Sequence, residues 1–537
     1  MSILTSSNQT DGLKQAEAYS LLMVEYEEAI KKIQYLESSH QVLDAKVLSL
    51  EEEITRLKEQ IRLMQHRHFG KKSEIQIGEP IADPASSQPQ TVSGYTRNKG
   101  RKDYGRTIDT STLPRHKFYH DLSEENKICK GCHNALEKIG EEVSEQLEVL
   151  PMRLYVAEHT RCKYGCRCCH TIEMAPKPKA PIPKALAGGS LITDVVVSKY
   201  QYHLPLYRQS KILASYNAPI SDNTLGSWVI QSGDGLMSVY ECLWKIILGA
   251  FYLQVDETPV KILKPEKQGY LWTYFAPHVG KGLVIFEMSL TRSGTVAEDR
   301  LANFKGRLQT DGYAGYNKLR KRKDVTGLGC VTHARRKFSE VLKITNNPTG
   351  IAAELIERLK PLYALEDRMR EQNLSFHTRK RLRQKQAWPI LKALHPWLKQ
   401  QLLKTPPKSK LGGALQYMLN QWPYLITYLR HGDAEIDTNW VENKIRPTAL
   451  GKKNWLFMGH KDSGLIHALW YSLVQSAVLN GLNPRLYVHY LLSKTHDLRT
   501  KTVDPMTLLP HTIDHDHLRS FANDQIALAK EVLGDSS

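Results

Sequence analysis

Phe-Tyr-Leu-Gln-Val-Asp at residues 251–256 is an apolar, strand-like run that ends in a carboxylate, Asp256. Arg-Leu-Gln-Thr-Asp at residues 307–311 is a second strand-like stretch, and its Asp311 comes immediately before a turn residue, Gly312. Aspartate is common at strand ends, so either residue alone is most simply a turn residue. A third acid further along the chain changes that interpretation.

This third acid is Glu442, within Asp-Thr-Asn-Trp-Val-Glu-Asn-Lys-Ile-Arg at residues 437–446. The stretch begins like a helix, because its first two residues are both suitable N-caps. Three convergent carboxylates can hold two Mg²⁺ or Mn²⁺ ions about 4 Å apart, which activate an attacking oxygen and stabilise a leaving one in phosphoryl transfer. The predicted catalytic and metal-binding residues are therefore Asp256, Asp311 and Glu442.

Two neighbouring acids compete for these roles. Glu257 directly follows Asp256, and because side chains alternate along a strand we expect it to point away from Asp256. Asp437 stands where a helix N-cap is expected, and we predict that it caps the helix instead of binding metal.

The segments between the acids predict a mixed sheet. Residues 270–276 and 283–288 are rich in aromatic and β-branched side chains and are separated by a Gly-Lys-Gly turn, which indicates a hairpin. A short helix, the Asp311 strand, a further helix and a last apolar strand are expected at residues 295–304, 307–311, 313–321 and 327–332. Three antiparallel strands followed by strand, helix and strand is the order of the ribonuclease-H fold.

The stretch between Asp311 and Glu442 is too long for that fold alone. Residues 340–430 look almost wholly helical, so we expect a helical insertion inside a catalytic domain of residues 245–470. Past the third acid, cations mixed with an aromatic residue indicate a DNA-binding surface. Its predicted members are Arg446, Lys452 and Lys453.

Composition points to a multidomain protein with a polyanionic partner. The chain has 537 residues, too many for a single core. Its 74 Lys and Arg outnumber 56 Asp and Glu, giving a net charge of +18 and a pI near 9.3, as expected for nucleic-acid binding. No signal pattern and no apolar run of roughly 20 residues is found, so we expect a cytosolic protein without membrane contact. In that compartment cysteines are metal ligands or core thiols more often than disulfides.

Six of the eight cysteines lie close together in the sequence. Cys129 and Cys132 form one Cys-x-x-Cys pair, and Cys166 and Cys169 form another. Four thiolates in two such pairs suit tetrahedral Zn²⁺. We therefore predict a structural zinc site within a zinc-binding domain of residues 126–175. A redox pair is the alternative, but nothing nearby resembles a thioredoxin unit.

The first 70 residues carry a heptad repeat. Leucine or methionine recurs at the d positions from Leu36 to Met64, and β-branched residues fill most a positions from Ile33 to Ile61. Charged residues at the e and g positions would attract each other across a parallel dimer. We predict a leucine-zipper coiled coil at residues 15–70 that joins subunits into a homodimer or higher oligomer. A single amphipathic helix packed on the body is the alternative.

Two further segments are candidates for DNA binding. Residues 71–125 form a polar and then basic linker, in which Arg101 and Lys102 either lie along phosphates or are simply solvated. Residues 176–240 contain a helix, a short turn and a second helix that Ser221 would cap, which is a helix-turn-helix outline. Any helical hairpin can produce that outline, so the pattern is only moderately specific.

Separated motifs resemble one known family. They include Cys129-x-x-Cys132, Val255-Asp-Glu-Thr-Pro259, Thr310-Asp-Gly-Tyr-Ala314, His333-x-Arg-Arg-Lys-Phe338 and Gly451-Lys-Lys-Asn-Trp-Leu-Phe457. In this order they resemble the DDE transposases of the insertion-sequence sixty-six family, the TnpC proteins. The departures are small: Lys452 stands where Arg is usual, and Thr438 interrupts a paired Asn.

The resemblance implies a multidomain α+β protein with an N-terminal coiled coil, a zinc-binding module, a helix-turn-helix-like segment and a ribonuclease-H-like catalytic domain with a helical insertion. It also implies a C-terminal transposase domain at residues 471–505, followed by a tail at residues 506–537. The catalytic triad it implies is Asp256, Asp311 and Glu442, and the zinc ligands are Cys129, Cys132, Cys166 and Cys169. Arg335 and Arg336 of the His333 motif are further expected DNA contacts.

An enzyme of this kind binds the terminal inverted repeats of its element, hydrolyses a phosphodiester at each end and joins the freed 3′-OH to target DNA. We expect it in the bacterial cytoplasm at the nucleoid, with accessory proteins of the same element as candidate partners. A transposon-derived DNA-binding repressor without cleavage activity is the alternative, and the intact acids argue against it. A host nuclease or resolvase would need neither paired ends nor the zipper.

The zinc prediction is tested by removing one ligand. Because a structural zinc site supplies folding energy, Cys129→Ser or Cys166→Ser should unfold the module around it. Metal analysis of the full chain should then find about one Zn²⁺ fewer per molecule. Cys242→Ser, which lies outside the paired motifs, is the control. Equal zinc content in all of these proteins would contradict the site.

The zipper prediction is tested at Leu50, a d position. Proline there breaks both the helix and the seam, so Leu50→Pro should convert an associated chain into a monomer in sedimentation. Ser49→Ala changes a helical residue off the seam and should leave the association intact. The prediction is wrong if the unchanged chain already sediments as a monomer.

Overall fold

The computed structural model of the protein describes residues 152–165, 172–264 and 266–533, parts of a helix between residues 23 and 57, and residues 127, 134 and 135. Outside the described residues lie Arg101, Lys102, Cys129, Cys132, Cys166 and Cys169. In the described part next to the second cysteine pair, strands β1 (Lys163–Gly165) and β2 (Ile172–Met174) pair antiparallel.

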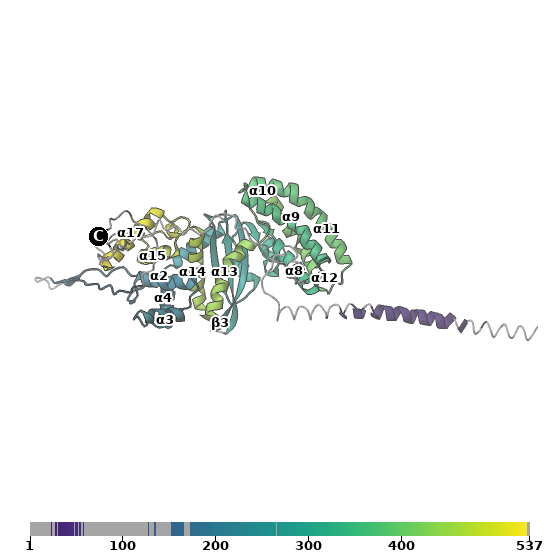
Figure 1. The fold of residues 1–537 in the computed structure, drawn as a ribbon, viewed down its shortest axis with the longest axis horizontal. Helices are drawn as coiled ribbons and strands as arrows, with labels where there is room; N and C mark the ends of the chain where they lie inside the picture. The colour runs from purple at the N-terminus through teal and green to yellow at the C-terminus, as the bar shows by residue number, and fades with distance from the viewer. Residues whose placement is uncertain are drawn as a thin grey trace, which may run out of the picture. The chain divides into compact units, whose positions relative to one another are not determined.

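A mixed sheet forms the centre of the larger described region (Figure 1). Its order is β5-β4-β3-β6-β7, and β8 also pairs with β3. The strands are β3 (Tyr252–Lys264), β4 (Lys267–Ala276), β5 (Leu283–Ser289), β6 (Gly306–Gln309), β7 (Val325–Leu328) and β8 (Met458–His460). Strand β4 runs antiparallel to both β3 and β5. Strands β6 and β8 run parallel to β3, and β7 runs parallel to β6. The predicted hairpin is confirmed as β4 and β5.

The pairing of β3 with β6 ends at Gln254 and Gln309, two residues before Asp256 and Asp311. This parallel pairing covers Tyr252–Gln254 and Arg307–Gln309. Strand β8 pairs with β3 only further along, at Ile262 and Lys264. Asp256 therefore lies inside a 13-residue strand, between the part paired with β6 and the part paired with β8. The apolar run of the sequence ends at this residue, but the strand does not, because its pairing with β4 continues to Ile262.

A helix covers the edge of the sheet at β5. Helix α14 (Asp462–Leu479) places Ser472 and Ser476 one turn apart on the face that meets this strand. Ser472 Oγ accepts the Phe286 N–H at 2.9 Å, and Ser476 Oγ accepts the Val284 N–H at 3.0 Å. An uncovered edge strand would expose these N–H groups to other chains, so α14 closes this edge.

Helices from before and after the sheet in the sequence share one buried core with the strands. Those before it are α2 (Gly189–Tyr200), α3 (Leu206–Ser215), α4 (Asp222–Asp234) and α5 (Met237–Leu248), and those after it include α14, α15 (Pro484–Ser493), α16 (Thr495–Arg499) and α17 (His515–Leu533). Ser221 caps α4 as predicted, since its hydroxyl accepts the Thr224 N–H at 3.2 Å. The short helices α6 (Gly294–Arg300) and α7 (Asn317–Arg320) connect β5 to β6 and β6 to β7.

A second core lies beside β7 and consists mainly of helices. These are α8 (Val331–Thr345), α9 (Ile351–Glu371), α10 (Phe376–Leu382), α11 (Trp388–Leu403) and α12 (Lys410–Leu425), with a π-helical turn at Arg383–Ala387 between α10 and α11. Figure 1 shows them gathered on the other side of the sheet from α2 and α15. Tyr252 of β3 and Leu328 of β7 belong to this core, so the sheet anchors it. The predicted strand at residues 327–332 is wrong in its second half, because α8 already begins at Val331.

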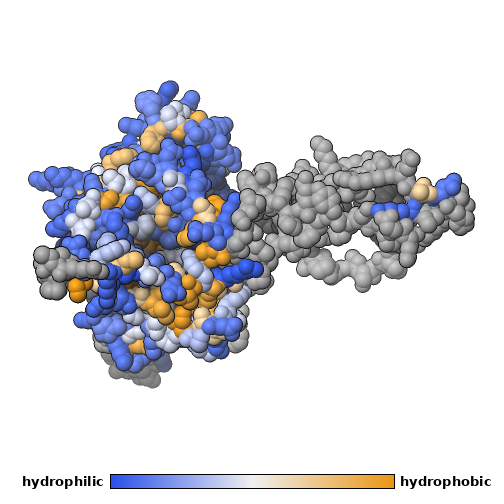
Figure 2. Space-filling view, turned by 90° about the vertical axis from the view of Figure 1, so that its left-hand side faces the viewer, coloured by the Kyte–Doolittle hydropathy of each residue, from blue (hydrophilic) through white to orange (hydrophobic). Residues whose placement is uncertain are grey.

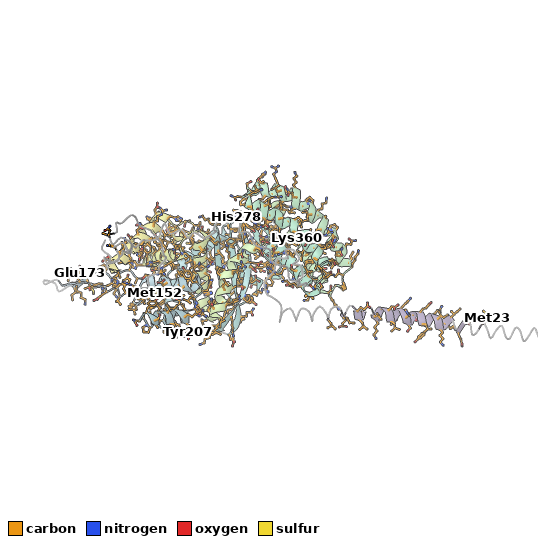
Figure 3. The ribbon with its side chains drawn as sticks, viewed as in Figure 1. Met23, Met152, Glu173, Tyr207, His278 and Lys360 are labelled. Atoms are coloured by element: carbon orange, nitrogen blue, oxygen red, sulfur yellow. The ribbon has the colours of Figure 1, made fainter. Side chains whose placement is uncertain are left out.

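A turn of the sheet also contacts these helices. His278 lies between β4 and β5 (Figure 3) and stacks on Phe251, with ring centroids 5.5 Å apart. It meets Phe376 of α10 edge to face at 5.0 Å. Its Nε2 atom lies 2.7 Å from the carbonyl oxygen of Asp433, which precedes α13 (Asn439–Trp455). The helical insertion is thus held against the β4–β5 turn as well as against β7.

Five charged side chains meet where the insertion reaches the segment that leads into α13. Arg383 donates to both carboxylate oxygens of Glu366, at 2.8 and 2.7 Å, and neither residue is exposed. Arg379 contacts Glu366 at 3.4 Å and Glu435 at 2.6 Å, and Arg370 contacts Glu435 at 2.7 Å. Buried charges are stable only when they are paired and hydrogen-bonded. This cluster therefore fixes α9, α10 and Glu435 relative to one another.

In the N-terminal segment, residues 30–47 are helical. Ile33, Leu36, Leu43 and Val47 occupy predicted a and d positions, and each is exposed by 51–58%. An apolar stripe of this length is unfavourable in water without a partner.

No helix in the described part of the chain is long and apolar enough to cross a membrane. The face of the molecule in Figure 2 is largely hydrophilic, and its apolar residues gather in patches between the hydrophilic ones.

The buried charge cluster predicts a large effect on stability. Arg383→Met leaves Glu366 with one weaker partner, so we expect a loss of about 3 to 5 kcal/mol in the free energy of unfolding. Lys360→Gln (Figure 3) removes an exposed pair with Glu357 at 2.7 Å and should cost at most about 1 kcal/mol. Chemical denaturation monitored by circular dichroism measures both. A similar small loss in the two variants would contradict the assignment of the cluster as a structural joint.

Candidate active site

Asp256 is partly buried in the middle of β3. Its Oδ1 atom accepts the backbone N–H of Glu257 at 2.9 Å. Burial raises the pKa of Asp256 well above its usual range, and the negative charges of Glu257, Asp311 and Glu442 raise it further. The two other predicted acids are therefore close enough to act on Asp256 electrostatically.

Glu257 is occupied by structural partners. Its Oε1 atom accepts from Arg292 Nε at 2.7 Å, and its Oε2 atom accepts from the Tyr316 hydroxyl at 2.6 Å. Burial raises the pKa of Glu257, whereas the hydrogen bonds from Tyr316 and Arg292 oppose that rise. Glu257 thus serves to hold Arg292 in place.

Asp311 follows β6 at the start of a turn. Its Oδ1 atom accepts the Tyr313 N–H at 2.9 Å, which is the local turn bond that aspartate favours. The Gly312 N–H donates to the Tyr417 hydroxyl at 3.1 Å, and a Cβ at Gly312 would overlap that hydroxyl. Tyr417 belongs to α12. The insertion therefore contacts the turn that carries Asp311, and a larger residue at Gly312 would displace the end of the Tyr417 side chain.

Glu442 lies in the first turn of α13, where a helix favours negative charge. Arg336 Nη2, from α8, donates to Glu442 Oε2 at 3.2 Å. His333 Nδ1 lies 3.6 Å from Oε1, and the Thr438 hydroxyl donates to the same oxygen at 3.3 Å. The carboxylate is thus already engaged by groups from α8 and from its own helix start.

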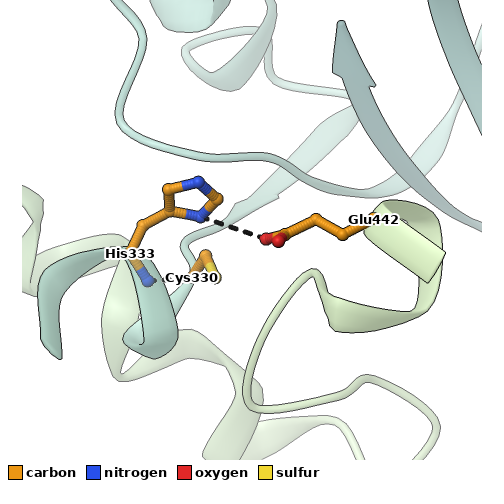
Figure 4. A group of neighbouring side chains, drawn as sticks. All are labelled: Cys330, His333 and Glu442. Carbon is orange, nitrogen blue, oxygen red and sulfur yellow. Dashed lines mark hydrogen bonds and ion pairs between the residues drawn. The ribbon is translucent and has the colours of Figure 1, made fainter. Parts of the chain in front are cut away.

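Cys330, His333 and Glu442 form a compact group (Figure 4), with their ligand atoms within 4.8 Å of one another. Asp256 and Asp311 do not belong to it. Cys330 Sγ accepts the His333 N–H at 3.4 Å and so caps α8, and burial raises the pKa of this thiol to about 12. Burial lowers the pKa of His333, although the negative charge of Glu442 opposes this.

A groove of about 340 Å³ opens beside Asp311. Its lining includes the cations Arg292, Arg336 and Lys337 and the aromatic residues Tyr313 and Tyr417. The Arg292 guanidinium lies 4.3 Å from the Tyr313 ring centroid, and Lys337 Nζ lies 4.5 Å from that of Tyr417. Cations neutralise phosphates and aromatic faces stack on bases, so this lining suits a nucleic-acid strand.

The predicted DNA-binding residues fall in different settings. Arg336 lines the groove, whereas the Arg335 guanidinium lies 5.4 Å from the Tyr363 ring centroid and so faces α9. Arg446, Lys452 and Lys453 follow Glu442 along α13. Lys452 Nζ donates to the Pro259 carbonyl oxygen at 2.8 Å, and Arg446 and Lys453 are exposed.

Sequence reasoning did not find Arg292, Lys337 and Tyr417. They come from the β5–α6 connection, α8 and α12, and no local motif unites them. Two further residues could have been singled out from the sequence by their unusual position. Gln254 and Gln309 are amides in otherwise strand-like stretches, each two residues before a predicted acid.

Asp437 behaves as a helix-terminal acceptor. Its Oδ1 atom accepts the N–H of Asn439, the first residue of α13, at 3.0 Å. Its Oδ2 atom accepts the Thr332 hydroxyl at 2.8 Å. Burial raises the pKa of Asp437, and these hydrogen bonds oppose the rise. Both oxygens are thus used in holding the helix start.

In the described residues the three predicted acids do not form a group with ligand atoms within 4.8 Å of one another, so it is their type of donor atom that suits a divalent cation. Mg²⁺ and Mn²⁺ prefer oxygen ligands, which Asp256, Asp311 and Glu442 supply. Burial, and after it the negative charges of the neighbouring acids, raise the pKa of Asp256, and a cation bound nearby would oppose that rise. One oxygen of Glu442, Oε2, is paired with Arg336.

Residues 184–465 match the family model described as transposase IS66 family, and residues 126–170 match the zinc-finger binding domain of transposase IS66. The chain is 30% identical to the uncharacterized protein y4jD of Sinorhizobium fredii (strain NBRC 101917 / NGR234), over 88% of this chain and 97% of the relative. It is 28% identical to the uncharacterized protein y4hP of the same organism, over 83% of each chain.

Proposed function

This chain belongs to the transposase IS66 family, and we propose that it is the DNA transposase of an insertion sequence. It binds the terminal inverted repeats of its element, hydrolyses a phosphodiester at each end, and joins each freed 3′-hydroxyl to target DNA. The observation that carries the proposal is that Asp311, in the turn after β6, and Glu442 of α13 lie close enough to act electrostatically on Asp256 of β3, and that Asp311 lines a groove with three cations.

The catalytic residues are Asp256, Asp311 and Glu442, which would hold two Mg²⁺ or Mn²⁺ ions. When bound, such ions activate an attacking oxygen and stabilise a leaving one. The chain itself must place these carboxylates and keep neighbouring acids from binding the metal ions in their stead. Both oxygens of Glu257 accept from Arg292 and Tyr316, and both of Asp437 accept from Asn439 and Thr332, whereas among the described residues Asp256 and Asp311 each use only Oδ1 in a hydrogen bond.

We assign the sheet to the ribonuclease-H type. The strand order β5-β4-β3-β6-β7 supports this assignment, with an antiparallel meander followed by two parallel strands. In this arrangement the first acid lies on the central strand β3 and the second directly after its parallel neighbour β6.

The groove beside Asp311 would receive the DNA strand. Arg292 and Arg336 line the groove together with Asp311, so both could neutralise phosphates of a strand bound there. Arg292 is positioned by its bond to Glu257 and by Tyr313, whose ring lies against the guanidinium and whose hydroxyl donates to the Arg292 carbonyl oxygen at 2.6 Å. A cation held from two sides is preorganised for a phosphate.

Two subunits would bring two DNA ends together through the N-terminal helix. The exposed apolar stripe at Ile33, Leu36, Leu43 and Val47 supports a parallel coiled coil, since pairing would bury it. The zinc-binding domain would add a folded module between this coiled coil and the catalytic part of the chain.

Replacing the three acids should separate chemistry from binding. Asp256→Asn, Asp311→Asn and Glu442→Gln keep the side-chain shape but replace an anionic ligand by a neutral amide. We expect each to lose cleavage and strand transfer by at least about 100-fold, the scale at which essential metal and electrostatic contacts act. Binding to a labelled repeat end, measured by fluorescence anisotropy, should remain because the cations of the groove are unchanged.

Asp437→Asn is the matched control, because Asn caps helices about as well as Asp. It should retain cleavage. The third carboxylate is misassigned if Glu442→Gln is active while Asp437→Asn is inactive. If the unchanged protein binds repeat ends but never cleaves them with Mg²⁺ or Mn²⁺, the protein is a DNA-binding repressor.

A further inference from the structure

Two buried glutamines lie side by side beneath the candidate active site. Gln254 of β3 and Gln309 of β6 are directly paired in the parallel register, and neither is exposed. Gln254 Nε2 donates to Gln309 Oε1 at 2.9 Å. The Tyr252 hydroxyl donates to the same Gln309 oxygen, and its own oxygen lies 2.9 Å from Gln254 Nε2, whose two hydrogens are shared among Tyr252, Gln309 and the Asp437 carbonyl. The two strands are thus joined through side chains as well as through their backbones.

The same amides bind the backbone that leads into α13. Gln254 Nε2 donates to the Asp437 carbonyl oxygen at 3.0 Å, and Gln254 Oε1 accepts the Val441 N–H at 3.0 Å. Gln309 Nε2 donates to the carbonyl oxygens of Glu435 and Gly329, each at 2.9 Å. Strand side chains therefore hold residues that are distant in the sequence.

The bond to Val441 is a helix cap supplied from another element. Val441 is the third residue of α13, where the N–H groups have no partner within the helix. Thr438, at the N-cap position, makes no side-chain cap bond. Gln254 takes that role across 187 residues of chain, and the residue after Val441 is Glu442.

Each amide also lies two residues before an acid. Gln254 and Asp256 share one face of β3, because side chains alternate along a strand. Gln309 ends β6, and Asp311 follows two residues later. One hydrogen-bonded unit thus contacts the element of every predicted catalytic acid.

We propose that Gln254 and Gln309 are positioning residues that set the relative placement of Asp256, Asp311 and Glu442 for metal binding. The inference rests on the proposed function. Tyr252 completes the unit, because its hydroxyl also accepts the Glu435 N–H at 3.2 Å. Neither glutamine touches the reacting atoms, so both act through the backbone of α13 and through the strands that carry the aspartates.

The experiment measures cleavage of a repeat-end duplex against Mn²⁺ concentration, with full-length Gln254→Met and Gln309→Met. Methionine fills a similar volume but makes no comparable hydrogen bonds. Groups that orient metal ligands typically change metal affinity or activity by about 10- to 100-fold. We expect the apparent Mn²⁺ constant to rise by about that factor, with repeat-end binding unchanged.

Gln209→Met is the matched control. Gln209 is a buried glutamine of α3 whose Nε2 atom donates to the carbonyl oxygens of Leu204 and Val195, at 2.9 and 3.3 Å. It should lose thermal stability like the other two but keep the wild-type Mn²⁺ dependence. If Gln254→Met and Gln309→Met change the Mn²⁺ constant no more than Gln209→Met does, the glutamines are only structural and the inference is wrong.

If the methionine variants do not fold, Tyr252→Phe tests whether the hydrogen-bonded unit positions the acids. It removes one hydroxyl from the unit and keeps the ring in its core, and we expect a rise of roughly tenfold in the apparent Mn²⁺ constant. An unchanged constant in this variant would overturn the inference. Asp256→Asn tests the proposed function separately from the inference about the glutamines. If this variant cleaves like the unchanged protein, the proposed function fails, whatever the glutamine variants do.

Discussion

The hydrogen bonds of Gln254 are the constraint on which the candidate site depends. This amide joins β3 to β6 through Gln309 and joins both strands to the start of α13 through Val441. A buried amide is costly unless its donor and acceptor are paired, so the network tolerates little displacement of these elements. Asp256 and Glu442 are far apart in the sequence, but their elements are tied at this point.

The helical insertion packs against the sheet and also contacts segments that carry the candidate acids. Its core includes Tyr252 of β3, and its Arg379 and Arg370 bind Glu435, which lies close before the start of α13. It also places Tyr417 against Gly312, beside Asp311. Because the insertion contacts the segments that carry two of the acids, loosening it should affect the site as well as the stability of the chain.

The distribution of charge over the whole chain differs from that at the candidate site. The chain as a whole carries +18, which favours association with a polyanion such as DNA. At the site, burial and neighbouring acids raise the pKa of Asp256, and Arg336 already balances part of the charge of Glu442. Under the proposed function, the overall positive charge would attract nucleic acid, and the acids at the site would hold the divalent cations.

Local patterns in the sequence were sufficient for the β4–β5 hairpin and the Ser221 cap, because alternation, turns and capping involve neighbouring residues. The three acids could be proposed from the sequence only as a set, because an aspartate at a strand end is by itself most simply a turn residue. Only the tertiary structure showed that Asp256 lies inside β3 and that Gln254 caps α13. It alone gathered Arg292, Lys337 and Tyr417 into one groove. Such contacts join residues tens to hundreds of positions apart, and a pairing at that separation leaves no periodic trace in a single sequence.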